Sequence, residues 1–354
     1  MLETIFFLLF PEDENFELKG EAEKQARNLY RSCMNTTRIK ELGAQPLLDL
    51  LKKIGGWSIS GDFNIKDWDF QKALELNHNY YNADSFFMWN IMIDMKNSTR
   101  HGLTVHQNEL TLKSRIYYIN KTMDDKIMSV YLEYMTKVGV LLGGEEHVTR
   151  LQMQDVLKLE MKLAEIMAPD EEQTNYKLMY RKVIISQLQD VAPFINWRNF
   201  FNSIFKKVGR EIHSSEPVVV LAFDYLKKLS KLVTQYLSNA QGRVTVANYL
   251  AWTLVHSKLN KLSKPFRDAA NHLFMATRGG FPVDTHWKIC AFDVHESVKF
   301  ALSAMIVREA SAGGSKTMAQ NMIQGIKEAF KDNFPSLKWM DPEARKLAMD
   351  KVRN

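Results

Sequence analysis

The segment of this chain that comes nearest to a catalytic metal site is His295-Glu296-Ser297-Val298-Lys299. A helical zinc site that activates water has two histidines four residues apart on one helix face, with a glutamate as general base. Here Lys299 takes the place of the second histidine, and its ammonium group would repel the cation. No His-Glu-x-x-His sequence occurs in the chain. The sequence therefore predicts no catalytic residue and no metal ligand, and we interpret His295 and Glu296 as the polar flank of a helix.

Two other segments only partly match known chemical sites. His101 and His106 flank a predicted hairpin without a cysteine or carboxylate at ligand spacing, so a surface or cross-strand pair is favoured over a metal site. Residues 313–317 (Gly-Gly-Ser-Lys-Thr) lack the first glycine and the preceding strand of a phosphate-binding loop. We interpret Ser315 as a helix N-cap instead. No Gly-x-Ser-x-Gly turn and no Cys/His arrangement indicates a nucleophile.

The two cysteines, Cys33 and Cys290, are the remaining candidates for covalent chemistry. Two thiols in a long chain are compatible both with buried, unbonded cysteines and with a disulfide. Composition alone favours the free thiols and leaves the disulfide open.

Composition indicates an ordinary globular protein of 354 residues, 45% hydrophobic and 25% charged, with a net charge of +6. The basic residues are interleaved with acidic ones instead of clustering as a nucleic-acid surface requires, so no nucleic-acid partner is expected. The apolar run at residues 5–10 is far shorter than the roughly 20 residues that span a bilayer. We expect this run to be the last turns of a packed helix whose beginning is missing, and we predict no membrane segment in this chain.

Helical periodicity dominates the chain and predicts a mostly α-helical fold. The clearest stripe runs from Ala222 to Tyr236, and further helices are expected near 67–80, 178–190, 196–207, 244–262, 265–276, 286–310, 316–331 and from Asp341. One stretch differs: residues 89–95 alternate with period two, residues 96–102 are polar, and residues 103–106 are apolar again, which predicts one small β-hairpin. Residues 217–220 are a candidate short extended segment. A polar linker at 168–175 is a possible point of subdivision of one domain covering 1–354.

Several local motifs, in a fixed order over residues 29–349, resemble the neprilysin-like zinc endopeptidases, a family that includes neprilysin and endothelin-converting enzyme. The motifs are Tyr-Arg-Ser-Cys-Met at 30–34, Gly-Ala-Gln-Pro-Leu at 43–47, Gly-Gly-Trp at 55–57, Phe-Ile-Asn-Trp at 194–197, Asn-Tyr-Leu-Ala-Trp at 248–252, Pro-Phe-Arg-Asp-Ala at 265–269 and Trp-Lys-Ile-Cys at 287–290. The segment 113–118 departs from the family pattern, because Lys113 and Ile116 replace a proline and an aspartate.

The resemblance covers only the N-terminal part of such an enzyme. It implies a multi-helix lobe like the non-catalytic lobe of neprilysin, which restricts substrates to short peptides. It also implies that the C-terminal zinc catalytic domain is absent from this chain, so that the cofactor zinc and the catalytic lobe, as a partner, belong to the full-length protein.

The resemblance also implies that Cys33 and Cys290 are bonded to each other in an oxidising compartment, which favours an extracellular or cell-surface ectodomain. Three sequons, at Asn35, Asn97 and Asn120, are compatible with glycosylation in the secretory pathway. Asn97 is the best placed, at the polar hairpin tip.

Two functions remain open at this stage. The first is the N-terminal, substrate-restricting part of a metalloendopeptidase, inactive by itself, as a fragment or truncated gene product. The alternative is a secreted, non-catalytic relative that binds peptides or proteins. The helical register that continues to the last residues, without a capping glycine, favours the first.

Overall fold

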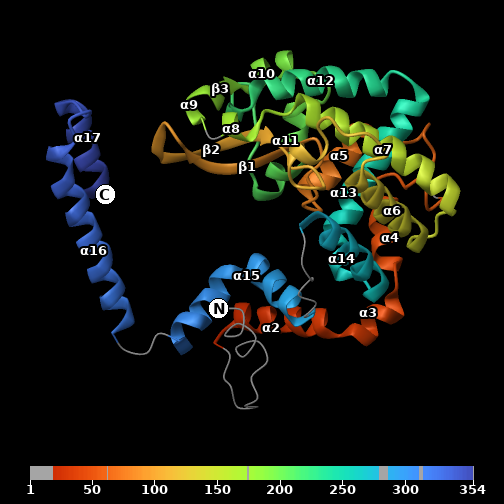
Figure 1. Cartoon of the computed structure of the whole chain (residues 1–354), viewed down its shortest axis with the longest axis horizontal. Helices are drawn as coiled ribbons and strands as arrows, with labels where there is room; N and C mark the ends of the chain where they lie inside the picture. The colour runs from red at the N-terminus through yellow and green to blue at the C-terminus, as the bar shows by residue number, and fades with distance from the viewer. Residues whose placement is uncertain (1–18, 62, 174, 279–285, 311–313, 354) are drawn as a thin grey trace. The chain divides into compact units, whose positions relative to one another are not determined.

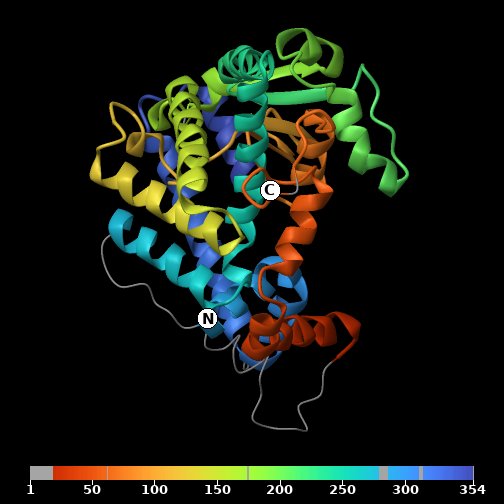
Figure 2. The ribbon, with the colours of Figure 1, turned by 90° about the vertical axis from the view of Figure 1, so that its right-hand side faces the viewer.

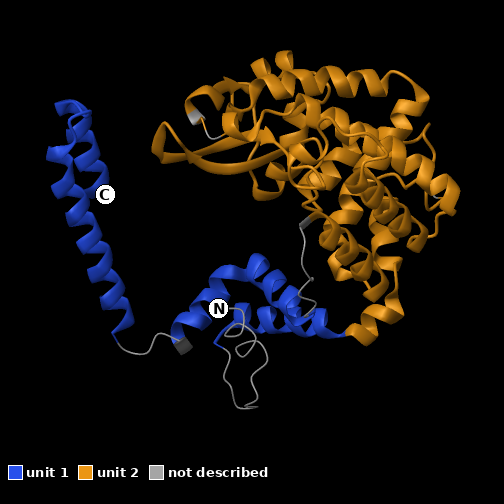
Figure 3. Ribbon diagram, in the orientation of Figure 1, with its two compact units in different colours: residues 1–35, 284–354 blue, residues 36–283 orange. Residues whose placement is uncertain are grey.

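The computed structural model describes residues 19–61, 63–173, 175–278, 286–310 and 314–353. The apolar run at residues 5–10 therefore lies outside the described residues. The chain divides into two compact units, a larger unit of residues 36–283 and a smaller unit of residues 1–35 with 284–354 (Figure 3). Residues 168–175 lie inside the larger unit. No described helix is both long enough and apolar enough to cross a bilayer.

The larger unit is mostly helical, as the apolar stripes predict. Its helices are α3 (Thr36–Leu42), α4 (Gln45–Lys53), α5 (Phe70–Asn79), α6 (Lys126–Leu141), α7 (Glu146–Ile166), α8 (Asp170–Gln173), α9 (Tyr176–Met179), α10 (Ile185–Val191), α11 (Trp197–Phe205), α12 (Phe223–Leu237), α13 (Ala240–Lys258) and α14 (Lys264–Arg278). Short 3₁₀ turns lie at η1 (Arg115–Tyr117), η2 (Lys206–Val208) and η3 (Leu259–Lys261).

Helix α13 lies at the centre of the larger unit, in contact with α4, α5, α7 and α12 (Figures 1 and 2). Its N-cap Asn239 accepts a hydrogen bond from the backbone N–H of Gly242 at 2.8 Å. Gly242 packs so closely on the preceding helix that a Cβ atom would lie 2.1 Å from the carbonyl oxygen of Tyr236. Only glycine fits there, and it allows α12 and α13 to turn tightly onto each other.

A four-stranded sheet accompanies the helices, in the order β1-β2-β4-β3. The strands are β1 (Phe87–Asp94), β2 (Asn97–Gln107), β3 (Tyr180–Ile184) and β4 (Pro217–Leu221). The β1–β2 and β3–β4 pairs are antiparallel, and β2 runs parallel to β4. The predicted hairpin and the predicted extended segment at 217–220 are thus both present.

The sheet corrects two boundaries. Residues 97–102, expected as a polar loop, belong to β2, because both faces of this end of the hairpin are exposed and no apolar alternation is needed there. Residues 180–184, expected as the start of a helix, form β3, because they pair with all five residues of β4. Only from Ile185 does α10 begin.

The turn of the hairpin is joined to the opposite edge of the sheet by Asp94. Its Oδ2 lies 2.8 Å from Nζ of Lys182, and its Oδ1 accepts hydrogen bonds from the backbone N–H of Lys96 and from the hydroxyl of Tyr180. The Lys182 ammonium above all, helped by the Lys96 N–H, lowers the pKa of Asp94 to about 2. The carboxylate therefore stays ionised and links β1 to β3.

The smaller unit contains α2 (Glu21–Met34), α15 (His286–Ala310), α16 (Ser315–Asn333), the turn η4 (Phe334–Ser336) and α17 (Pro342–Arg353). Helices α2 and α15 pack together through buried Ala26, Tyr30, Cys290, Ala291, Val294, Leu302 and Met305. An ion pair between Arg308 and Glu23, 2.7 Å long, closes one end of this pair. Helix α17 packs on α16 and η4, where Phe334 is buried.

Candidate functional site

The His295 segment lies on α15, where the backbone is not regular. Val298 has φ −136° and ψ 39°, which interrupts the helix between His295 and Lys299. The Lys299 side chain is exposed, and its ammonium lies 5.7 Å from the Phe300 ring centroid. The turn that would have to hold two metal ligands on one face is therefore kinked and carries a cation.

The structure does not bring His101 and His106 together as a ligand pair. Both lie on β2, an odd number of residues apart, so their side chains point to opposite faces of the strand. His101 is exposed, whereas His106 is half-buried with its Nδ1 3.1 Å from the carbonyl oxygen of Gln107. Burial lowers the pKa of His106, which favours the neutral ring.

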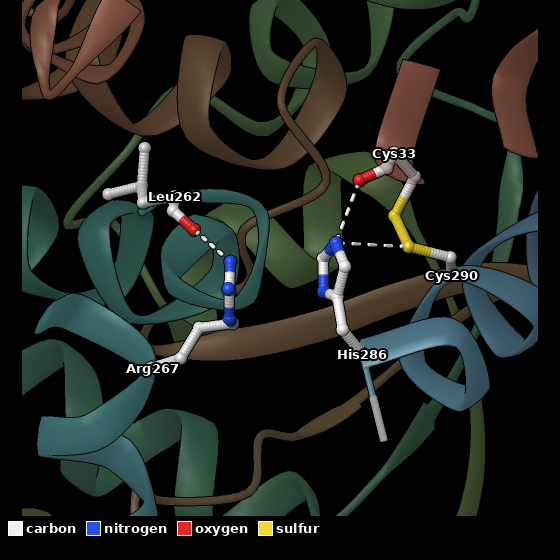
Figure 4. Close-up of a disulfide and its surroundings, with 5 residues drawn as sticks. All are labelled: Cys33, Leu262, Arg267, His286 and Cys290. Atoms are coloured by element: carbon white, nitrogen blue, oxygen red, sulfur yellow. Dashed lines mark hydrogen bonds between the residues drawn. A yellow bond between two sulfur atoms is a disulfide. The ribbon is translucent and has the colours of Figure 1, made fainter. Parts of the chain in front are cut away.

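Cys33 and Cys290 form a disulfide that joins α2 to α15 (Figure 4). The S–S distance is 2.07 Å and the Cα atoms are 5.6 Å apart, inside the usual range of 4.4–6.8 Å. The bond links residues that are 257 positions apart in the sequence. It lies beside the apolar cluster of α2 and α15, where Cys290 is fully buried.

His286, which the sequence analysis did not single out, lies directly against this disulfide. Its Nε2 is 2.8 Å from the carbonyl oxygen of Cys33 and 3.6 Å from Sγ of Cys290. The signal that could have revealed it is the four-residue spacing to Cys290, which puts both side chains on one face of α15.

The three sequon asparagines are all exposed. Asn35 forms the C-cap of α2, two residues after the disulfide, and Asn120 adopts a left-handed conformation with φ 57°. Asn97 begins β2 directly after the hairpin turn, and its Oδ1 accepts hydrogen bonds from the backbone N–H and the hydroxyl of Thr99.

A buried polar network around Glu160 was not predicted either. Glu160 lies on α7 and is completely buried. Its carboxylate accepts hydrogen bonds from the hydroxyls of Thr111 at 2.6 Å, Tyr118 at 2.8 Å and Tyr131 at 2.9 Å. Burial raises the pKa of Glu160, and the three hydroxyl donors oppose that rise in part. The network is enclosed in the core and joins α6 and α7 to the segments on both sides of η1.

Helix α16 has an apolar face that the described residues of the smaller unit do not cover. Gly314 occupies the N-cap position and Ser315, predicted to be the cap, is the first helical residue. None of the 19 residues of α16 is buried. The large apolar side chains on this face and their exposed fractions are Met318 (73%), Met322 (63%), Ile323 (53%), Ile326 (60%) and Phe330 (56%). Four of them recur every fourth residue and so lie along one side of the helix.

The N-terminal family model of peptidase family M13 matches residues 8–354. The chain is 44% identical to an endothelin-converting enzyme homolog of Locusta migratoria, over 95% of this chain and 46% of that protein. It is 40% identical to neprilysin-3 of Drosophila melanogaster, over 94% of this chain and 43% of that protein. The chain thus spans less than half the length of these relatives.

A solved structure shares the fold. The zinc metalloprotease Zmp1 of Mycobacterium tuberculosis, in complex with an inhibitor, superposes with a TM-score of 0.82 at 19% identity, over 99% of this chain and 51% of that one. At this identity the likeness concerns the fold alone.

Proposed function

The chain belongs to peptidase family M13, and we propose that it is the N-terminal, substrate-restricting helical part of a neprilysin-like zinc metalloendopeptidase. In this proposal zinc and the groups that cleave the peptide belong to a C-terminal catalytic lobe, and this chain alone hydrolyses nothing. The lobe formed here limits access to short peptides.

The observation that carries the proposal is the exposed apolar face of α16. A contiguous row of large apolar side chains in water is unfavourable, and such patches mark interaction sites. More than half of the length of these relatives lies outside the part that this chain matches, which supports a catalytic lobe as the partner. Met318, Met322, Ile326 and Phe330 would then be buried against that lobe.

A chimera tests this proposal. This chain would replace the matching part of the locust endothelin-converting enzyme homolog, leaving the remainder of that protein in place. We expect the chimera to cleave a short fluorogenic peptide in a zinc-dependent way and to leave a folded protein intact, whereas this chain alone cleaves neither. Zinc-dependent cleavage by the chain alone would contradict the proposal.

The docking face is tested in the same chimera by changing Met322 and Ile326 together to aspartate. We expect the peptidase activity to fall by at least about tenfold, because burying one unpaired carboxylate at an interface costs several kcal/mol. In the isolated chain both side chains are exposed, so its melting temperature should fall only slightly, by the small cost of two aspartates in one helix. Gln324→Asp, on the opposite side of α16, is the matched control. If the double variant keeps full activity, the apolar face is not a docking surface, and peptide binding by the isolated chain would then favour the non-catalytic binding module.

We further propose that the protein is extracellular or exposed at the cell surface and carries an N-glycan at Asn97. Its exposed position beside the hairpin turn would let an oligosaccharide extend into water. In a eukaryotic secretory host we expect an amidase that removes N-glycans to reduce the mass of the protein. Thr99→Ala should abolish the Asn97 glycan, because it removes the hydroxyl that the sequon requires. Ser98→Ala, which leaves the sequon intact, is the control and should still lose the mass of the glycan when the amidase is added. If the amidase changes the mass of the two variants equally, or of neither, the assignment is refuted.

A further inference from the structure

Three potential metal-binding atoms meet at the disulfide of the smaller unit. Sγ of Cys33, Sγ of Cys290 and a ring nitrogen of His286 all lie within 4.8 Å of one another. His286 and Cys290 are four residues apart on α15, and Cys33 faces them from α2 (Figure 4). Two helices of the same unit therefore already hold these side chains at one point.

The separation of His286 from Cys290 fits a tetrahedral metal centre. Zinc bonds of about 2.3 Å to sulfur and about 2.0–2.1 Å to nitrogen, at tetrahedral angles, hold the two donor atoms about 3.6 Å apart. The distance between Nε2 of His286 and Sγ of Cys290 is 3.6 Å. This nitrogen lies beside Cys33, where it donates a hydrogen bond of 2.8 Å to the Cys33 carbonyl oxygen, so in the disulfide form the ring proton resides on Nε2.

Charge and burial also suit a metal with two thiolates. The surroundings are apolar, since Ala26, Tyr30, Ala291 and Val294 belong to the same cluster. A buried centre there must be close to neutral, because an unpaired charge is costly in such an environment. One Zn²⁺ with two thiolates and a neutral imidazole has no net charge. Cys33 and His286 are only half-buried, which leaves a route for the ion and a solvent molecule as fourth ligand.

We propose that reduction of the Cys33–Cys290 disulfide converts this point into a zinc site with Cys33, Cys290 and His286 as ligands. A phosphine reductant and one water molecule cleave the S–S bond, giving two thiols and a phosphine oxide. Zinc then displaces the two thiol protons, which pass to solvent. The ring proton of His286 moves from Nε2 to Nδ1, the hydrogen bond to the Cys33 carbonyl is given up, and Nε2 binds the metal. Either the disulfide or the metal thus joins α2 to α15. This site is separate from the catalytic zinc of the proposed function and does not depend on that function.

The experiment uses the full chain with Zn²⁺ or Co²⁺ alone as the probe. After reduction with tris(2-carboxyethyl)phosphine and removal of excess metal, we expect one zinc per chain above the level retained by the oxidised chain. Cobalt should give a thiolate-to-metal charge-transfer band in the reduced chain only. His286→Ala should weaken zinc binding by about 10- to 100-fold or more, since even the loss of an outer-shell partner costs that much. His295→Ala, on the same helix, is the control and should bind zinc normally.

Helical circular dichroism distinguishes a lost site from a lost fold. If reduction unfolds α2 and α15, zinc should restore the helical signal of the wild type and not that of His286→Ala, which supports the site. Equal zinc contents in the reduced and oxidised chains would overturn the proposal. So would zinc binding that His286→Ala leaves unchanged, or a reduced chain that stays unfolded in excess zinc.

Discussion

Removal of the Cys33–Cys290 bond is expected to lower the free energy of unfolding of the smaller unit by roughly 2–5 kcal/mol. The bond closes a loop between residues 257 positions apart, and the chain-entropy model gives about 5 kcal/mol for a loop of that length. In the reduced state α2 and α15 are held by a small apolar cluster and the Arg308–Glu23 ion pair. Without the bond, these contacts must form between two helices that are free to separate in the unfolded chain.

Denaturant unfolding of the oxidised wild type and of the double variant Cys33→Ala, Cys290→Ala measures this loss. Alanine is preferable to serine, because a serine hydroxyl at the fully buried position 290 would add its own cost. Reducing the wild type in metal-free buffer should reproduce the loss, and the same reductant should not affect the double variant. An unchanged unfolding midpoint in the double variant would show that the bond does not stabilise the unit.

The helical part of this fold follows from sequence pattern where helices are amphipathic. The stripe from Ala222 to Tyr236 corresponds to α12, whose Leu226, Leu229 and Val233 are buried. The sequence pattern predicts α13 four residues too late, because this helix is buried on nearly all sides and has no polar face to mark its register. The Asn239 cap and Gly242, which fix its start, become meaningful only when the packing of α12 is known.

The sequence pattern does not identify contacts between residues that are far apart in the chain. Residues 180–184 lie within a predicted helix, and their pairing with β4 makes them a strand instead. The cysteine pair came from family resemblance, since two thiols in a chain of 354 residues do not identify each other. His286 is marked only by its spacing to Cys290, and the backbone at Val298 is not predictable from the helical run around it.

Glu160 shows this limit best. It follows Leu159, which belongs to a regular apolar stripe, so the sequence pattern indicates a carboxylate on the surface. The side chain is nevertheless completely buried. Its hydroxyl partners, Thr111, Tyr118 and Tyr131, come 49, 42 and 29 residues earlier in the chain. No local signal connects them. The network also continues to α13, because the indole N–H of Trp252 donates to the Tyr131 hydroxyl at 3.0 Å.

Replacing Glu160 by leucine is therefore expected to destabilise the larger unit by about 3–5 kcal/mol. Leucine fills most of the volume but accepts no hydrogen bond, and each buried donor left unpaired costs about 1–3 kcal/mol. Glu160→Gln keeps one acceptor oxygen and should cost less. Glu165→Leu, at an exposed position of the same helix, is the matched control and should change stability by less than about 0.5 kcal/mol. Urea unfolding at one pH measures all three, and equal stability of Glu160→Leu and the wild type would contradict the role of the network.

The pH dependence of unfolding tests in which direction burial shifts the pKa of the Glu160 carboxyl. Burial raises the pKa of Glu160 above its ordinary value of 4.5, so over the interval between the two values the folded state holds a proton that the unfolded state has released. By linkage, stability falls as pH rises through this interval and stays at the lower level above it. Glutamine does not titrate, so the stability of Glu160→Gln lacks this decrease with pH. The stability of the wild type minus that of Glu160→Gln should therefore decrease as pH is raised from about 4 towards neutrality. A difference that increases with pH would mean that the hydroxyl donors outweigh burial and that the carboxylate is the favoured buried form.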